Sequence, residues 1–541
     1  MLSSARWRCR MKAWWHSGRP WVWLTSGAVS LSLLAMLALL ALLTGQSLRL
    51  LWPQPIYSFD LISPPGVLLG ERVGVQRPLV PTAGVPMDPE IWLIRTGNRP
   101  QDSYRLPAAQ VRASRLPADV LVVQRRNGAR LYGYLAGMRE DGQPLTAASM
   151  SAALEQRLRL SATQRRLAAQ VEQQRSAVRA QRAQQQSLPL HRQGVPSEQQ
   201  RAAQQAAQNE RQTAYEALSE QLAAIERERG RVQLVLADAQ GQRQVIPLSD
   251  IDSLWYPNAM SLGQKLRHLA AQTWRFVSLH DPVREGDGVF PAMAGTLLLV
   301  ILMSVIVMPL GVMAAIYLHE YAARHWLTRL IRIAVGNLAG VPSIVYGIFG
   351  LGFFVYAVGG SLDKLFYADT LPAPTFGTPG LLWAALTLAL LTLPVVIIAT
   401  EEGLARIPPS LRQGSLALGA TQAETIWRVV LPGAAPAMMT GLILAVARAA
   451  GETAPLMLVG VIKSAPKLPL DGTFPFLHPE RQFMHLGYQI YDLAFQSQDG
   501  DAVQPMAFAT ALLLIVIVVS LNLAAMGLRH RLREKYRALT L

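Results

Sequence analysis

The sequence predicts an all-α polytopic membrane protein with six transmembrane helices and a small α+β domain inserted after the first of them. The 541 residues are 51% hydrophobic and 16% charged, which is too apolar for a disordered chain and too unevenly apolar for a soluble enzyme. Crossing the hydrocarbon layer takes about 20 residues. Six intervals reach or approach that length without Asp, Glu, Lys or Arg: 20–48, 288–318, 333–362, 370–400, 429–447 and 502–528.

We expect each interval to form a helix, because lipid offers no hydrogen-bond partners and a helix satisfies its own backbone. The first interval also resembles a cleaved signal peptide, since basic residues precede it. Its apolar run is about twice the usual length, however, and no small-x-small cleavage site follows Leu43, so we expect a retained anchor. The expected helices are Trp21–Leu43, Pro291–Leu318, Ala334–Val358, Leu381–Thr400, Ala437–Val461 and Ala507–Leu528.

Positive charges in short segments predict the orientation, because they resist translocation. The tail up to Arg19 and the tail from Arg529 each hold five Lys or Arg, whereas the short loop after the third span holds only Lys364. Both termini are therefore expected in the cytoplasm. The chain then divides into a cytoplasmic N-tail, a first helix, a periplasmic domain (the outer domain), a helical core and a cytoplasmic C-tail: 1–20, 21–45, 46–289, 290–528 and 529–541.

The outer domain contains two predicted β-hairpins. In each, a Gly-containing dipeptide that tolerates positive φ separates two short apolar runs, Asn127-Gly128 in the first and Gln240-Gly241 in the second. The expected strand pairs are Asp119–Val123 with Leu131–Leu135, and Val232–Leu236 with Gln244–Leu248.

A stretch rich in Gln, Ala, Arg and Glu, at about 148–230, lies between the two hairpins. A segment with Pro and Gly at 188–196 divides it into two arms, in which apolar residues recur at spacings of three, four and seven. This pattern predicts an antiparallel coiled-coil hairpin. A disordered Gln-rich linker is the alternative.

Motifs for bond chemistry are missing from the sequence. The only Lys followed by Ser or Thr is Lys463, and no glycine-rich phosphate cradle precedes it, so the chain has no P-loop. A single cysteine excludes disulfides and Cys-cluster metal sites. The basic outer domain lacks the interleaved aromatic residues of a nucleic-acid platform. We therefore expect a protein that is not an enzyme, with no metal, no cofactor of its own and no nucleic-acid partner.

The segment between the fourth and fifth spans, 401–433, is predicted to lie in the cytoplasm and is too polar to cross the membrane. Pro408, Pro409 and Ser410 favour the start of one short helix, and Thr421 with Glu424 fits a capping box that starts another. Two short helices at a membrane surface suit docking into a groove on a partner. A folded-back surface loop is the alternative.

The same segment resembles the EAA loop of bacterial ABC importer permeases, in which Gly and then Ile-x-Leu-Pro follow a Glu-Ala-Ala triad at fixed spacing. Gly419 and the pair Leu431-Pro432 fit that spacing. The triad departs from it, because Gln413, Gly414 and Ser415 stand where Glu-Ala-Ala is expected. The resemblance implies that this is the coupling loop gripped by an ATPase dimer, and Gln413 lacks the carboxylate that makes the usual polar contact in the family.

Two further stretches resemble signatures of phosphate-specific permeases, specifically of their A-type subunits. These are 337–347, which reads NLAGVPSIVYG, and 448–456, which reads RAAGETAPL. The resemblance covers 290–541 and implies a six-helix ABC importer permease in the bacterial inner membrane that conducts inorganic phosphate. It further implies a C-type permease subunit, a cytoplasmic ATPase dimer that binds ATP and magnesium, a periplasmic phosphate-binding protein and membrane lipid as partners. The alternatives are a permease for sulfate or molybdate, or a membrane-anchored coiled-coil scaffold.

Arg448 and Glu452 are the only charges inside a predicted span. Each costs about 3 kcal/mol at mid-membrane, so something must compensate it. Their i, i+4 spacing allows them to neutralise each other on one helix face. The functional alternative, favoured by the resemblance, places Arg448 on the translocation path against a phosphate oxyanion, with Glu452 holding or gating the guanidinium. Ser343 either lines the same path or bonds within its own helix.

Overall fold

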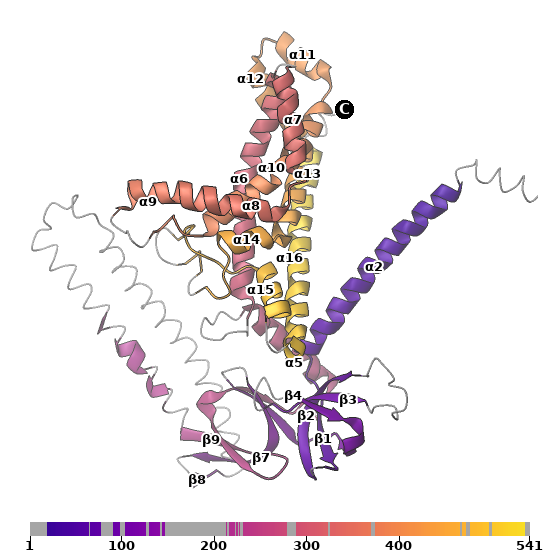
Figure 1. The fold of residues 1–541 in the computed structure, drawn as a ribbon, viewed down its shortest axis with the longest axis vertical. Helices are drawn as coiled ribbons and strands as arrows, with labels where there is room; N and C mark the ends of the chain where they lie inside the picture. The colour runs from indigo at the N-terminus through magenta and orange to yellow at the C-terminus, as the bar shows by residue number, and fades with distance from the viewer. Residues whose placement is uncertain are drawn as a thin grey trace, which may run out of the picture.

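A computed structural model describes residues 19–63, 65–76, 90–97, 103–125, 129–140, 143–145, 231–278, 288–322, 325–368, 374–465, 468–471, 476–496 and 500–535, with a few more between 212 and 227. A helical bundle stands on a β-rich domain, and the helix that precedes this domain slopes away from the bundle (Figure 1). The predicted fold class is confirmed: the described residues contain six helices long and apolar enough to span a membrane.

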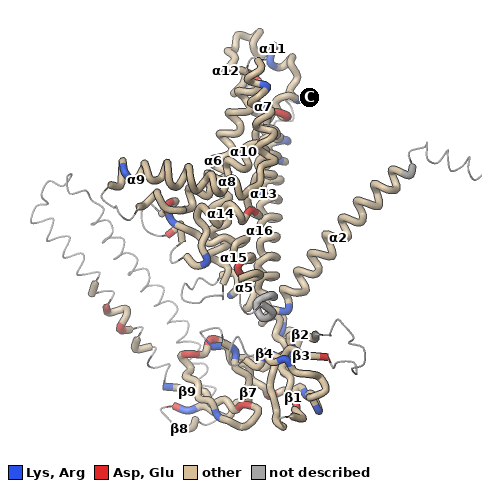
Figure 2. Tube along the Cα trace, viewed as in Figure 1, with Lys and Arg blue, Asp and Glu red and all other residues tan. Residues whose placement is uncertain are grey.

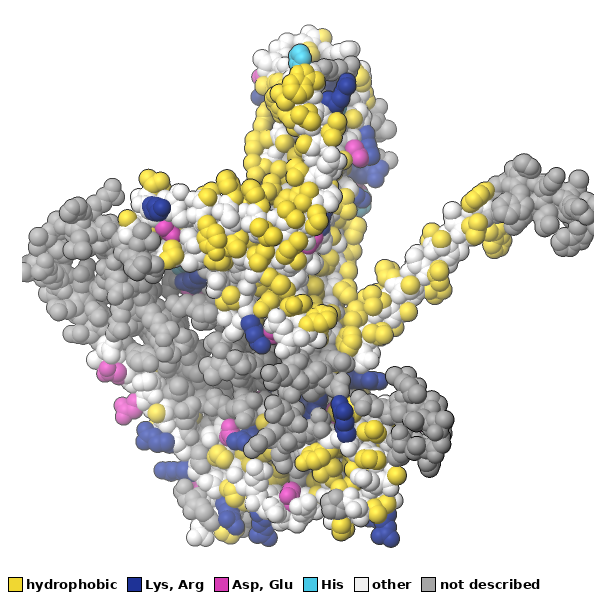
Figure 3. All heavy atoms as spheres, in the orientation of Figure 1, with side chains coloured by type: hydrophobic (Ala, Val, Ile, Leu, Met, Phe, Trp, Pro, Cys, Tyr) yellow, Lys and Arg dark blue, Asp and Glu magenta, His cyan; other side chains and the backbone are white. Residues whose placement is uncertain are grey.

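The membrane-length helices agree with the predicted intervals, and several continue through short π-helical segments. These helices are α2 (Arg19–Leu51), α6 with η3 (Phe290–Ile316, Tyr317–Tyr321), α8 with η4 and α9 (Ser343–Phe349, Gly350–Gly359, Gly360–Phe366), α10 (Leu381–Ala405), α12 with η6 and α13 (Gln422–Thr425, Ile426–Val430, Leu431–Gly451), and α16 (Gly500–Lys535). Hydrophobic side chains cover much of their outer surface, as expected for helices in lipid (Figure 3).

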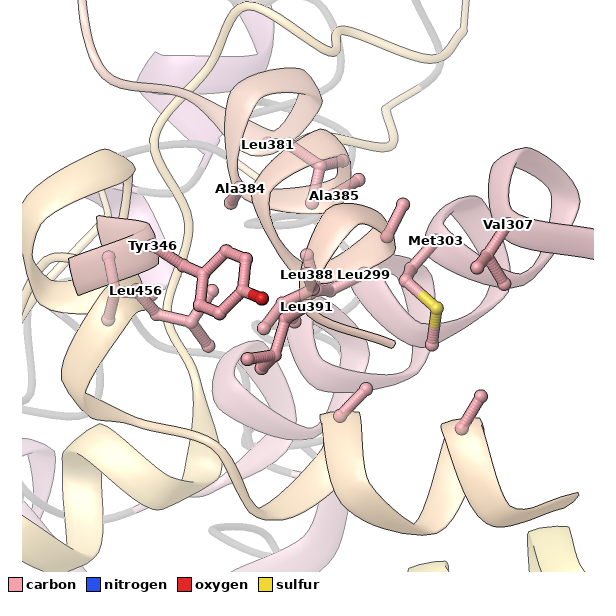
Figure 4. Packing of buried hydrophobic residues seen from close by; sticks show 14 of the residues in the cluster. Leu299, Met303, Val307, Tyr346, Leu381, Ala384, Ala385, Leu388, Leu391 and Leu456 are labelled. Carbon is pink, nitrogen blue, oxygen red and sulfur yellow. The ribbon is translucent and has the colours of Figure 1, made fainter. Parts of the chain in front are cut away.

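Helix α10 is the centre of the bundle. It packs against α6 on one side and α13 on the other. Leu388 and Leu391 of α10 are fully buried with Leu299 and Met303 of α6, and Tyr346 of α8 closes the same cluster (Figure 4). By contrast, most side chains of α2 are exposed within this chain, although α2 contacts α16 near its end.

The prediction of one continuous third span, Ala334–Val358, is wrong. A helix of 13 residues, α7 (Trp326–Leu338), ends in a turn, and α8 begins only at Ser343. Pro342 takes an extended conformation and lacks the N–H that would continue the ladder, so the chain changes direction there. Figure 1 shows α8 and α9 running across the bundle. The Tyr346 hydroxyl donates to the Leu338 carbonyl at 2.7 Å and ties the two pieces together.

The fifth span, predicted as Ala437–Val461, is also interrupted. Helix α13 ends at Gly451, and Glu452 is extended with ψ of 126° before α14 (Ala454–Val459) begins. Pro455 lies in the first turn of α14, where a missing N–H costs nothing. Beyond α14 the chain forms α15 (Leu486–Tyr491) and η7 (Asp492–Gln496) before α16.

Two antiparallel sheets make up the outer domain. The first has the order β4-β3-β2-β1-β5 and the second β10-β9-β7-β6-β11, with β8 paired to β7. Their bounds are β1 (Ile56–Leu61), β2 (Gly66–Gln76), β3 (Ile91–Arg95), β4 (Ser103–Pro107), β5 (Val111–Arg115), β6 (Val120–Arg125), β7 (Arg130–Glu140), β8 (Gln143–Pro144), β9 (Val232–Ala237), β10 (Arg243–Pro247) and β11 (Ile251–Trp255). Two short 3-10 turns, η1 (Ala108–Gln110) and η2 (Leu248–Asp250), precede β5 and β11.

Both predicted hairpins are confirmed, as β6 pairs with β7 and β9 pairs with β10. Gly241 has φ of 81°, as the second turn requires. The predicted coiled coil at about 148–230 lies almost entirely outside the described residues. After the second sheet, α5 (Leu262–Ser278) leads back to the bundle.

Candidate functional site

Arg448 and Glu452 form a charge pair where α13 ends. The Arg448 Nε lies 3.5 Å from a Glu452 carboxylate oxygen, although Glu452 has already left the helix. The two side chains are 31% and 21% exposed. No other described residue forms a hydrogen bond or ion pair with the Arg448 guanidinium, so its Nη1 and Nη2 donors are free of described protein partners. The pair is therefore neutralised but not closed off.

Ser343 is the first residue of α8 and is half-buried. It has no side-chain hydrogen bond to any described residue, so the predicted intrahelical bond does not form. Its helix reaches α14, which starts two residues after Glu452. A Cβ added at Gly347 would lie 2.7 Å from the Pro455 Cα, so the two backbones touch there. The structure brings the helices of the predicted path residues together without linking Ser343 to either charge by a hydrogen bond.

One buried charge in a membrane-length helix is not among the residues predicted from the sequence. Asp363 in α9 is 1% exposed. Its carboxylate accepts bonds from the backbone N–H groups of Phe376 and Gly377, at 2.8 and 2.6 Å. This is a structural role, because the aspartate fixes the loop that leads into α10. The charge-free interval ends one residue before it, which is the only sequence signal that marks its position.

The cytoplasmic loop forms the two short helices that the sequence predicts. Helix α11 (Pro409–Ala417) is followed by Gly419, whose φ of 88° lies in the left-handed region. The capping box is present, with the Thr421 N–H donating to Glu424 at 2.9 Å and the Glu424 N–H donating back at 3.3 Å. Ser415 bonds Thr425 across the two helices at 2.9 Å. Of the triad residues, Gln413 and Gly414 are exposed and Ser415 packs inward.

An ion pair attaches this loop to the bundle. The Arg412 Nη2 lies 2.9 Å from Glu320 at the end of α6 and donates to the Leu404 carbonyl at the same distance. Arg332 of α7 lies 3.3 Å from Glu401. Neither pair is recognisable in the sequence, because the partners are far apart in the chain. Figure 2 shows charged residues gathered at this end of the bundle, beside α11 and α7.

Exposed apolar side chains project from the same loop. Leu418 is 90% exposed and Trp427 is 66% exposed, whereas Leu431 and Pro432 are half-buried where α13 begins. Large apolar side chains as exposed as Leu418 and Trp427 are typical of a protein-docking surface. The loop thus exposes apolar side chains for contact with a partner, and the Arg412–Glu320 ion pair holds its helix α11 to the bundle.

The helical bundle is similar to known transport proteins. The model of the binding-protein-dependent transport system inner membrane component family matches residues 307–537. Phosphate transport system permease protein PstA 1 of Mycobacterium tuberculosis (strain CDC 1551 / Oshkosh) is 34% identical over 258 residues, which is 46% of this chain and 72% of the relative. Phosphate transport system permease protein PstA of Yersinia pestis is 34% identical over 45% of this chain and 73% of the relative.

Among solved structures, the MetNI methionine ABC transporter in an inward-facing conformation covers 48% of this chain and 98% of its own matched chain, at 20% identity and a TM-score of 0.33.

The chain belongs to the membrane components of binding-protein-dependent transport systems and, within them, to the PstA-type permeases. It is a multi-pass inner-membrane permease of the ABC importer class, a class that works with a separate ATPase and a binding protein. The matched region begins in α6, so the outer domain lies outside it.

Proposed function

We propose that this chain forms the translocation path for inorganic phosphate in an ATP-driven importer and couples that path to a separate ATPase. The observation that carries the proposal is the Arg448–Glu452 pair at the break between α13 and α14, in a permease whose relatives are named for phosphate transport. A partly accessible guanidinium in a membrane protein attracts an oxyanion, because its planar donors match two phosphate oxygens.

Glu452 balances Arg448 while the path is empty. Because the carboxylate engages Nε, the two Nη groups remain free to bind the anion. A phosphate bound to the Nη groups of Arg448 balances part of the positive charge that Glu452 otherwise balances alone. The break after Gly451 puts the pair at the interruption between α13 and α14, where a small rotation of α14 would change its access.

The cytoplasmic loop supplies the coupling. We propose that Leu418 and Trp427 enter a groove on a cytoplasmic ATPase dimer and that Gln413 and Gly414 lie at its edge. ATP and magnesium bind to that partner, and the Arg412–Glu320 pair carries loop movement to α6. A C-type permease subunit completes the path, and a phosphate-binding protein delivers the anion. On this proposal both termini lie in the cytoplasm.

Radiolabelled phosphate uptake in cells that lack this subunit tests the proposal. We expect rescue by the intact chain, loss of at least about 90% of uptake in Arg448→Ala, and partial activity in Arg448→Lys, which keeps the charge without the planar donors. Arg243→Ala, on an exposed strand of the outer domain, is the matched control and keeps full uptake.

Near-normal uptake by Arg448→Ala at equal membrane levels would remove Arg448 from the mechanism. If the intact chain does not restore phosphate uptake, competition with sulfate and molybdate shows whether another oxyanion is carried. If the chain supports no uptake of any of these oxyanions while its partner subunits are present, the result favours the scaffold function over transport.

A further inference from the structure

Helix α5 turns its polar side toward the protein and its apolar side outward. On the polar side, the His268 ring lies 4.9 Å from the Trp255 ring of β11. Arg275 pairs with Asp252 and donates to the Ser253 hydroxyl at 3.5 Å. These contacts fix the rotation of the helix about its axis, because His268 and Arg275 are about two turns apart on one face.

The opposite side of α5 carries large apolar residues with no cover. Leu262, Leu266 and Trp274 are 74%, 57% and 72% exposed. A shallow apolar groove runs along this side, lined by Leu266, Leu269, Ala270, Thr273, Trp274 and Val277. An amphipathic helix of a soluble domain has the reverse orientation, with its apolar stripe on the core. The exposed side of α5 therefore faces something other than water.

The position of α5 identifies that medium. Its Phe276 belongs to a buried cluster with Val289, directly before α6, and Leu50 and Leu51 at the end of α2 pack on the same cluster. Helix α5 thus begins in the outer domain and ends beside the end of α2 and the start of α6, the two membrane-length helices that flank this domain. In Figure 1 it lies between the bundle and the strands.

The charges of α5 fit a phospholipid surface. The helix contains no acidic residue. With 3.6 residues per turn, Lys265 falls beside Leu269 at one edge of the apolar side and Arg267 falls beside Trp274 at the other. Basic residues that border an apolar side, together with a tryptophan, are typical of helices that lie in a membrane interface. Their long side chains reach headgroups while the apolar residues lie below.

We propose that α5 is an interfacial helix whose apolar side inserts into the leaflet on the outer-domain side, with Lys265 and Arg267 at anionic phospholipid headgroups. A partner subunit is the competing occupant. Lipid is favoured because the exposed side continues the apolar, uncovered surface of α2, which it joins at Leu50 and Leu51. The helix thereby holds the second sheet against the membrane through β11. This inference does not depend on which anion is transported.

The test uses the full-length chain with Cys9, its single cysteine, replaced by Ser. Leu266→Cys is labelled with the fluorophore NBD and reconstituted, with the partner subunits that copurify, into vesicles of phosphatidylethanolamine and phosphatidylglycerol. Quenching by doxyl-labelled lipid is compared with quenching by aqueous iodide. Val245→Cys is the matched control, because Val245 is also an exposed apolar residue of the outer domain, at 45%, on β10 rather than α5. Leu39→Cys in α2 is the control for lipid.

We expect the label at 266 to be quenched by doxyl lipid as strongly as the label at 39, and by iodide several-fold less than the label at 245. Quenching of 266 by iodide to the same degree as 245 overturns the proposal, because the apolar side would then face water. Protection of 266 from both quenchers also overturns it, since a protein partner would then cover the helix.

Discussion

At the scale of single residues, His485 shows how burial sets a protonation state. Its side chain is 1% exposed, and its Nδ1 accepts a bond from the Gly487 N–H at 3.1 Å, which caps α15. Its Nε2 has no hydrogen-bond partner among the described residues. Burial lowers the pKa of His485 to about 4, because the charged imidazolium loses its hydration.

This shift makes the stability of the folded protein depend on pH. The unfolded chain binds a proton at His485 below pH of about 6.5, whereas the folded chain does not until about pH 4, so stability falls as the pH decreases through that window. We expect a loss of about 2 kcal/mol from this residue between pH 7.5 and pH 5. His485→Asn keeps a capping side chain and removes the titration. Thermal unfolding in detergent at both pH values should therefore show a smaller pH dependence in His485→Asn than in the intact chain.

At the scale of elements, the contact between α8 and α14 depends on a missing side chain. Both helices result from interrupted spans, and they meet where Gly347 touches Pro455. The Cβ of any other residue at 347 would also lie 3.1 Å from the Pro455 carbonyl oxygen. Because the obstruction is backbone, a side-chain rotation does not relieve it.

We therefore expect Gly347→Ala to destabilise the protein by about 1 to 3 kcal/mol, the range for overpacked cores. Gly352→Ala is the matched control, since a Cβ at this position of the same continuous helix meets nothing within 4 Å. The thermal midpoints of the two variants in detergent check this. Equal midpoints would show that α8 and α14 do not pack as described.

The cytoplasmic loop is a second element whose position depends on one contact. Removing Arg412 leaves Glu320, whose side chain is 13% exposed, without its cation. We expect Arg412→Ala to weaken the attachment of α11 by about 2 kcal/mol, between the values for exposed and fully buried pairs. Arg406→Ala removes an exposed i, i+4 pair and serves as the control. Amide exchange over 409–417 should be faster in Arg412→Ala alone, and identical exchange in both variants would refute this role.

At the scale of the whole molecule, the chain carries an outer domain that lies outside the region matched by the family. Two sheets stand between α2 and α6, and the stretch at about 148–230, predicted as a coiled coil, interrupts the second sheet between β8 and β9. Our hypothesis is that this stretch positions the binding protein over the path.

Deleting Ala148–Gly230 tests that hypothesis. We expect phosphate uptake to fall while the chain still assembles with its partner subunits, because β7 and β9 are neighbours and a short linker can join them. Copurification of the partners and initial uptake rates measure the two effects. Unchanged uptake would make the stretch a spacer.

The sequence by itself determined the features that depend on local chemistry. Charge-free intervals predicted the spans, because lipid solvates no charge. Gly241 predicted its hairpin, and Thr421 with Glu424 predicted the start of α12, since a turn and a capping box involve neighbouring residues. The candidate residues of the path and loop were also named from the sequence, together with the class of the protein.

The tertiary structure decided what distant residues do together. The first sheet and the helix α5 were not predicted. Their hydrophobic patterns are short or mixed, and the packing of neighbouring elements decides which structure such segments form. The sequence contains Pro342 and Glu452, but the breaks of the third and fifth spans show only in the packed bundle, where α8 and α14 meet. Arg412 and Glu320 lie 92 positions apart, and only the fold makes them a pair. Contacts of this kind depend on how whole elements pack, which no local pattern in a single chain encodes.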